Sequence, residues 1–115
     1  MAEQNSPERD LAERKCKPCE GGTKPLTEKE IHGFLTRLSG WEYAKGEIVK
    51  TFAFKNYYQT TAFVNAVIWI AHSQDHHPQI EFGYKTCVVR YSTHAIQGIS
   101  ENDFFSAAKV EVLLK

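Results

Sequence analysis

The chain has 115 residues, of which 42% are hydrophobic and 24% are charged, so it is long enough for one domain with a modest core and too short for two. Its 14 basic and 14 acidic side chains give a formal net charge of zero, which argues against the basic surface typical of nucleic-acid-binding proteins. The apolar run AVIWIA is far shorter than the roughly 20 residues that cross a bilayer, and the 3 cysteines are an odd count for a secreted disulfide-bonded domain. We therefore expect one soluble, cytosolic domain with no membrane or direct nucleic-acid partner.

Residues 1–25 mix acidic and basic side chains, and Leu11 is their only large aliphatic residue after the initial methionine. Such a segment cannot form a core of its own, so we expect a flexible N-terminal arm followed by a domain at 26–115. Cys16 and Cys19 have the C-x2-C spacing of a zinc knuckle, but no second Cys or His pair accompanies them within the arm. Two unbonded thiols, a shared metal and a redox role all stay open for this pair.

The first predicted helix covers about residues 28–38. Thr27 stands three residues before Glu30, which is the spacing of a capping box, and Gly40 suits a left-handed helix stop. Apolar residues follow at helical spacing: Ile31, Phe34, Leu35 and Leu38. A hairpin follows, with a turn at Lys45-Gly46 and a strand at 47–55.

The second predicted helix begins after Asn56 and ends near residues 72–74, because Pro78 disfavours helical angles at the residue before it. One face carries Phe63, Val64, Val67, Ile70 and Ala71. The opposite face carries Tyr58, Ala62, Ala66 and Trp69. A single sheet cannot cover a helix that is apolar nearly all round, so we expect a second subunit to cover the outer face.

The remaining pattern comprises two strands and a final helix. Ile80, Phe82 and Tyr84 alternate as in a strand, and TCVVRYS at 86–92 forms its partner. Ser100 caps the last helix, whose predicted inner stripe is Phe104, Phe105, Ala108 and Val112. The order helix, two strands, helix, two strands, helix predicts an α+β fold with a four-stranded antiparallel sheet and the helices on one face.

Histidines gather at the joints between these elements. His72, His76 and His77 lie within six positions, and His94 follows the last strand, whereas His32 is expected on the surface of the first helix. Imidazoles titrate near neutral pH, so a cluster at the ends of elements can give and take protons. The alternative is a solvated loop pair without function.

Two further alternatives concern a metal and the role of Asp103. Asp75, His76, His77 and His94 are all competent metal ligands, but adjacent histidines in an extended segment tend to point to opposite sides. Asp103, three residues after the helix cap, is favoured as the partner of a capping pair and could instead orient an imidazole.

Four motifs together resemble the signature of the pterin-4a-carbinolamine dehydratases. They are H-S-Q-D-H-H-P at 72–78, Tyr84 six residues after the proline, S-T-H at 92–94 and S-E-N-D at 100–103. The resemblance covers about residues 26–115 and implies the same fold, assembled into dimers or tetramers. It also implies the dehydration of a 4a-hydroxytetrahydropterin to the quinonoid dihydropterin, a step of tetrahydrobiopterin recycling after aromatic amino acid hydroxylation. That chemistry needs neither a metal nor a redox cofactor.

The resemblance also implies roles for individual residues. His76 and His94 would form the acid/base pair, His77 would hold the pterin, and Asp103 would support His94. Substrate contacts are implied for His72, Asp75, Pro78 and Tyr84, with Pro78 shaping the pocket wall.

At position 72 many family members carry an acidic residue, and a histidine there predicts weaker activity or a shifted pH optimum. Animal members also act as dimerisation cofactors of a transcription factor, so a non-catalytic interaction protein is the alternative function.

Overall fold

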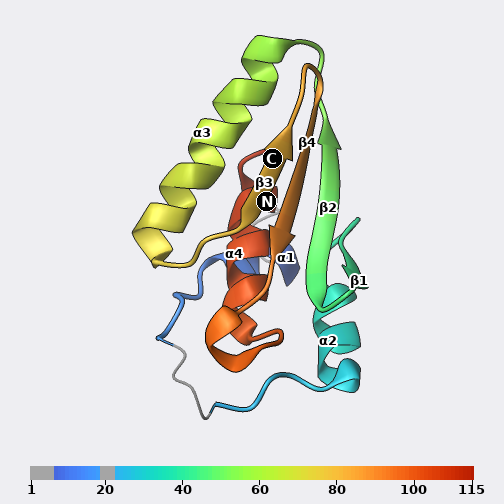
Figure 1. Ribbon diagram of the computed structural model, residues 1–115, viewed down its shortest axis with the longest axis vertical. Coiled ribbons are helices and arrows are strands. Elements are labelled where there is room, and N and C mark those ends of the chain that lie inside the picture. The colour runs from blue at the N-terminus through green and yellow to red at the C-terminus, as the bar shows by residue number, and fades with distance from the viewer. Residues whose placement is uncertain (1–6, 19–22) are drawn as a thin grey trace.

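The computed structural model describes residues 7–18 and 23–115 (Figure 1). In chain order, the elements are α1 (Pro7–Ala12), α2 (Glu28–Leu35), β1 (Glu42–Ala44), β2 (Glu47–Ala53), α3 (Tyr57–Gln74), β3 (Gln79–Phe82), β4 (Thr86–Tyr91), the short 3-10 helix η2 (His94–Ile96) and α4 (Glu101–Val112). Among the described residues, no helix combines the length and the apolar character that a membrane span requires.

The four strands form one antiparallel sheet in the order β1-β2-β4-β3, which confirms the predicted α+β class. The β1–β2 hairpin turns at Lys45 and Gly46, which both have positive φ, as the tight two-residue turn of a twisted hairpin requires. In the register of β2 and β4, Ile48 lies opposite Tyr91 and Phe52 opposite Cys87. These four side chains are buried on one face of the sheet, and α3 and α4 cover that face.

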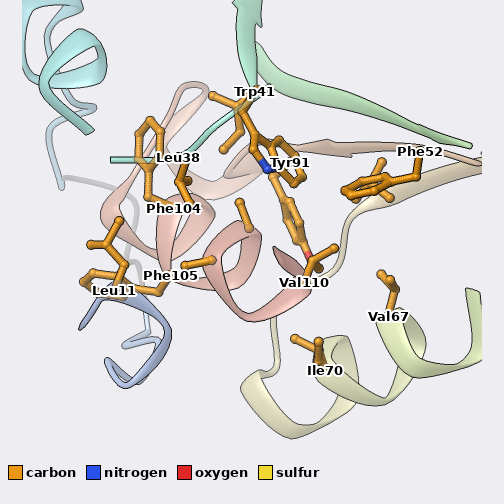
Figure 2. Packing of buried hydrophobic residues seen from close by; sticks show 14 of the residues in the cluster. Leu11, Leu38, Trp41, Phe52, Val67, Ile70, Tyr91, Phe104, Phe105 and Val110 are labelled. Carbon is orange, nitrogen blue, oxygen red and sulfur yellow. The ribbon is translucent and has the colours of Figure 1, made fainter. Parts of the chain in front are cut away.

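Aromatic residues from separate elements meet at the centre of the core (Figure 2). Trp41 packs against Phe52 and Tyr91, with ring centroids 6.1 Å and 6.2 Å apart, and Phe34 stacks on Phe104 at 4.8 Å. The indole nitrogen Nε1 of Trp41 donates a hydrogen bond to the buried carboxylate of Glu111.

Helix α3 has the predicted start and two predicted faces. The side chain of Asn56 accepts a hydrogen bond from the Gln59 backbone at the N-terminus, and Asp75 ends the helix in the left-handed conformation. The five residues of its predicted inner face are buried. On the outer face, Tyr58 is 82% exposed and Trp69 is 65% exposed within this chain.

Several predicted elements end earlier in the structure, among them β2, which ends at Ala53 rather than at residue 55. Helix α2 has its capping box between Thr27 and Glu30 but ends at Leu35 rather than near residue 38. Gly33 weakens the helix, and the Thr36 hydroxyl donates to the Gly33 carbonyl at 2.7 Å, so a turn replaces the last helical turn. Strand β3 ends at Phe82, so Tyr84 lies in the β3–β4 turn rather than in the strand.

The expectation of a flexible arm without a core is wrong for residues 7–18. These residues contain α1, and Leu11 on α1 is only 1% exposed (Figure 2). A single leucine is enough because α1 packs along α4, where Leu11 joins the core cluster near Phe105. Helix α4 is consequently buried on nearly all sides rather than along one stripe, and Val112 of the predicted stripe is only partly buried. Residues 1–6 and 19–22, and with them Cys19, lie outside the described residues.

Candidate functional site

A hollow of about 520 Å³ opens where several element ends converge. It is lined by residues of four segments: Cys16, Lys17 and Pro18; Gln74, Asp75, His76 and His77; Ser92, Thr93, His94 and Ala95; and Asn102. His76, His77 and His94 therefore line one hollow, as their positions at element ends predict.

Local backbone geometry places the histidine pair at the end of α3. Asp75 adopts φ 51° and ψ 45°, a left-handed conformation that Asp tolerates better than most residues, and its N–H donates to the carbonyls of Ala71 and His72. The chain then turns out of the helix, and the His76 N–H donates to the Ala71 carbonyl at 3.1 Å. As a result His76 points inward, half-buried, and His77 is exposed.

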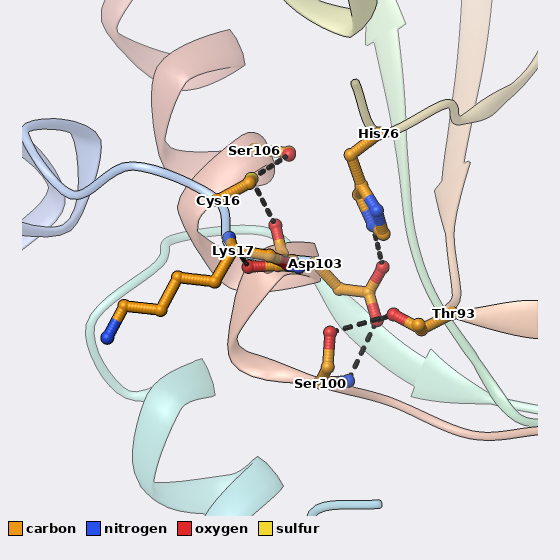
Figure 3. Close-up of polar contacts among 8 residues, drawn as sticks. Cys16, Lys17, His76, Thr93, Ser100, Asp103 and Ser106 are labelled. Atoms are coloured by element: carbon orange, nitrogen blue, oxygen red, sulfur yellow. Dashed lines mark hydrogen bonds and ion pairs between the residues drawn. The ribbon is translucent and has the colours of Figure 1, made fainter. Parts of the chain in front are cut away.

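His76 makes a short hydrogen bond to a fully buried carboxylate (Figure 3). Its Nε2 lies 2.6 Å from Oδ1 of Asp103, whose side chain is 0% exposed. The other carboxylate oxygen, Oδ2, accepts hydrogen bonds from the Thr93 hydroxyl at 2.8 Å and from the Ser100 N–H at 2.9 Å. Three donors from three segments therefore meet on one carboxylate.

Asp103 thus fulfils both roles that the sequence leaves open. It is the capping partner of Ser100 at the start of α4, and it also orients an imidazole. That imidazole belongs to His76, so the expectation that Asp103 supports His94 is wrong. The reason is that His94 lies in η2 and its side chain is exposed, whereas His76 is turned inward toward the start of α4.

The ring of His76 is also held by an aromatic neighbour. It lies nearly parallel to the ring of Tyr91, with an interplanar angle of 7° and centroids 5.9 Å apart. An ionised carboxylate only accepts hydrogen bonds, so Nε2 of His76 carries the hydrogen toward Asp103. The other ring nitrogen, Nδ1, then has a lone pair in the neutral imidazole and can act as a base.

The structure separates the remaining predicted substrate contacts. Asp75 lines the hollow with the histidines. His72 and Pro78 line a second hollow of about 330 Å³, which His77 also borders. Tyr84 lies beside Tyr57 at the start of α3, with ring centroids 6.1 Å apart, and the 18-residue helix separates it from His76. Their proposed substrate contacts stay predictions.

Several lining residues were not anticipated from the sequence. Thr93 is buried and bonds both Asp103 and Ser100, and Gln74 and Asn102 line the hollow together with residues 16–18. Thr93 could have been suspected from its place inside the S-T-H motif. Residues 16–18 gave no such signal, because their position depends on the packing of α1 against α4.

No group of three or more His, Cys, Asp or Glu side chains suited to a metal ion occurs within residues 7–18 and 23–115. Cys16 lines the hollow, and its thiol Sγ lies 3.4 Å from Oγ of Ser106. Its possible partner Cys19 is outside the described residues. Among the described side chains that line the hollow, His76 is held in place by its hydrogen bond to Asp103 and by the ring of Tyr91.

The fold and the site together define an α+β domain with an imidazole-lined hollow suited to acid/base chemistry. The sequence profile of the family described as Pterin 4 alpha carbinolamine dehydratase matches residues 24–113. The chain therefore belongs to the pterin 4 alpha carbinolamine dehydratase family.

Individual relatives agree with this membership. Proteins named "Putative pterin-4-alpha-carbinolamine dehydratase" from Nitrosomonas eutropha and Nitrosospira multiformis are 59% and 57% identical over 106 residues, which cover 91% and 92% of this chain and 94% of each relative. A crystal structure of a transcriptional coactivator/pterin dehydratase from Brucella melitensis is similar with a TM-score of 0.77 and 29% identity, covering 80% of this chain and 100% of the other. A pterin dehydratase-like protein identified as a RuBisCO assembly factor in the alpha-carboxysome is similar with a TM-score of 0.57 and 29% identity. The match covers 66% of this chain and 90% of that protein.

Proposed function

We propose that this protein is a dehydratase that converts a 4a-hydroxytetrahydropterin to the quinonoid dihydropterin and water. The reaction breaks the C4a–O bond and forms a C4a=N5 double bond while the proton leaves N5. One group must protonate the departing hydroxyl and another must accept the N5 proton. No electrons are exchanged with a cofactor, so two imidazoles suffice for the chemistry.

The observation that carries the proposal is the Asp103–His76 pair beside His94 in one hollow. Asp103 fixes the tautomer of His76, so Nδ1 is the proposed acceptor of the N5 proton. His94 is exposed in the same hollow and is the proposed donor to the leaving hydroxyl. The exposed His77 borders both hollows, which suits the proposed role of holding the pterin ring.

The direct test is the decay of chemically generated 4a-hydroxytetrahydropterin, followed by stopped-flow absorbance with and without the protein. We expect His76→Ala and His94→Ala each to lower turnover by about 10². His32→Ala is the matched control, because His32 is an exposed histidine of α2 that does not line the hollow. Wild-type turnover in both hollow variants would remove the catalytic assignment.

The exposed outer face of α3 favours a second candidate function, an oligomeric interaction protein. Tyr58, Ile68 and Trp69 expose large apolar surfaces on one helix, which is uncommon for a face that stays in water. This face could join copies of the chain into a homodimer or homotetramer, or bind a different protein. The two functions are compatible, because the face and the hollow use different side chains.

Light scattering coupled to size-exclusion chromatography tests this second candidate function by measuring the mass of the oligomer. Trp69→Glu places a charge in the proposed interface and is expected to lower the oligomer mass, whereas Lys29→Glu on the exposed side of α2 should not. An unchanged mass for Trp69→Glu would remove α3 as the assembly surface.

A further inference from the structure

Residues 16–18, called here the N-terminal strap, line the same hollow as His76, His77 and His94. The strap lies outside residues 24–113, which the family profile matches. One wall of the candidate site therefore comes from a segment that the family profile does not include.

Two side chains fix the strap from opposite helices. Asn102 is only 6% exposed, and both ends of its carboxamide bond the same residue: Oδ1 accepts from the Lys17 N–H at 2.9 Å, and Nδ2 donates to the Lys17 carbonyl at 2.5 Å. Gln74, the last residue of α3, accepts the Cys16 N–H on its Oε1 at 3.0 Å. The strap thus bridges the end of α3 to the start of α4.

Three polar side chains on one side of α4, called here the polar stripe, contact the segment that leads from α1 to the strap. Asn102, Ser106 and Lys109 are spaced i, i+4 and i+7, so they share one side of an otherwise mostly apolar helix. The Lys109 ammonium donates to the carbonyls of Ala12 and Arg14, and Oγ of Ser106 lies 3.4 Å from the Cys16 thiol (Figure 3). All three polar side chains of this stripe therefore contact the N-terminal segment.

The two anchors also lie close in sequence to His76 and Asp103. Gln74 is two positions before His76, and Asn102 immediately precedes Asp103. The anchors use the backbone N–H groups of Cys16 and Lys17, and Pro18 has none. The backbone of the strap therefore contributes shape to one wall of the hollow and does not offer N–H donors to a ligand.

We propose that the N-terminal strap is a wall of the substrate-binding site, held there by Asn102 and Gln74 as positioning residues, and that it determines how tightly the pterin is bound. The inference rests on the proposed function for the identity of the ligand. A wall that contributes only shape contacts the bound substrate and the transition state equally, so it stabilises both by the same amount. Releasing it should therefore raise KM and leave kcat nearly unchanged.

A double-mutant cycle shows whether Asn102 and Gln74 both act through the strap or each affects the site independently. We expect Asn102→Ala and Gln74→Ala each to raise KM by about fivefold, the effect of losing an ordinary hydrogen bond. If both act through the strap, the double variant falls well short of the product of the two effects, because the first substitution already frees the wall. Asn65→Ala and Gln79→Ala are matched controls, because both carboxamides are exposed and neither lines the hollow.

Alkylation of Cys16 by iodoacetamide, resolved by mass spectrometry, reports on the strap without relying on activity. Cys16 should react faster in each anchor variant than in the wild type. Cys87 is the internal reference for global unfolding, since it is fully buried and burial raises the pKa of its thiol. Unchanged labelling at Cys87 shows that the fold is intact.

Fluorescence titration with 7,8-dihydrobiopterin distinguishes failure of this inference from failure of the proposed function. An inactive wild type whose dihydropterin affinity still falls in the anchor variants would overturn the dehydratase and support the wall. An active wild type with faster Cys16 labelling but unchanged KM and affinity would overturn the wall, as would effects that multiply in the double variant. A wild type that neither turns over the substrate nor binds the dihydropterin would overturn both.

Discussion

The imidazole of His76 and the phenol ring of Tyr91 lie 5.9 Å apart at an angle of 7°, although 14 positions of the sequence separate the two residues. The Tyr91 hydroxyl is buried and has no hydrogen-bond partner among the described residues. Burial, followed by the nearby Cys16 and Asp103, raises the pKa of this phenol above its ordinary value. The ring therefore supports His76, while the hydroxyl makes no hydrogen bond within residues 7–18 and 23–115.

Tyr91→Phe should keep the ring contact and remove the unpartnered hydroxyl. We expect a free energy of unfolding equal to that of the wild type or up to about 1 kcal/mol higher at neutral pH, because a buried group without a partner carries a desolvation penalty. Turnover should persist, since the ring against His76 is retained.

The pH dependence of this variant has a definite sign. The folded-state pKa of Tyr91 is raised, so the unfolded chain releases this proton first as the pH rises past about 10. Above that pH the free energy of unfolding of the wild type therefore falls as Tyr91 ionises in the unfolded chain. The phenylalanine variant has no such group and does not lose this contribution. Urea denaturation of both proteins at about pH 8 and about pH 10.5 measures it. An advantage of the variant that shrinks with increasing pH would contradict the account.

Asp103→Asn tests whether one carboxylate serves both catalysis and stability. The change retains the shape but replaces a charged acceptor of three hydrogen bonds by a group with one acceptor oxygen. We expect turnover to fall by about 10² and the free energy of unfolding to fall by about 1–3 kcal/mol. Stopped-flow turnover and urea denaturation supply the two values.

Asp10→Asn is the matched control for that substitution. Its carboxylate pairs with the Arg37 guanidinium at 3.2 Å on the surface, where ion pairs contribute little. Equal stability losses in the two variants would show that the burial of Asp103 is not what makes it important.

Glu111→Gln should destabilise the fold without affecting the site. The Glu111 carboxylate accepts from Trp41 Nε1 at 2.9 Å and lies 2.5 Å from the Lys50 ammonium, with its side chain almost fully buried. The amide can still accept from Trp41, but it removes the charged partner of the partly buried Lys50 ammonium, which keeps its hydrogen bond to the Ser39 carbonyl. We expect a loss of about 2 kcal/mol in thermal or chemical unfolding, with KM and kcat unchanged. Glu101→Gln, an exposed substitution on the same helix, should change neither quantity.

His72→Glu introduces the acidic residue that the family resemblance implies at this position. His72 contacts Trp69, with ring centroids 5.4 Å apart, and borders the second hollow together with His77. A carboxylate there can accept hydrogen bonds from the amino-pyrimidine edge of a pterin held against His77, so we expect the KM of the substrate to fall. His72→Gln should leave KM nearly unchanged. An equal change in both variants would mean that polarity or size, not charge, is responsible.

Local chemistry made much of the fold predictable. The capping box at Thr27 and the Asn56 cap depend on residues within one helical turn, and β2 follows from a run of strand-forming residues after the Lys45-Gly46 turn. The histidine cluster was predictable for a similar reason, since each histidine falls at the end of an element. The partner of Asp103 was not, because the choice between His76 and His94 depends on how α3 and η2 are turned in three dimensions.

The N-terminal segment escaped prediction for a different physical reason. Its composition is that of a solvated arm, and nothing within it requires order. The order comes from α4, whose second apolar side receives Leu11 and whose polar stripe bonds the backbone that follows. The only hint in the sequence is the placement of Asn102, Ser106 and Lys109 on one side of an apolar helix, and that hint names no partner.

The docking of α1 on α4 has a consequence for the size of the cooperative folding unit. Residues 24–113 match the family profile, yet a chain cut back to that range would expose the side of α4 against which Leu11 packs. Apolar surface exposed in this way promotes aggregation and lowers the yield of recombinant protein. We therefore expect the smallest version of this protein that folds on its own to include α1, so that its N-terminal boundary lies before residue 24, where the family profile begins.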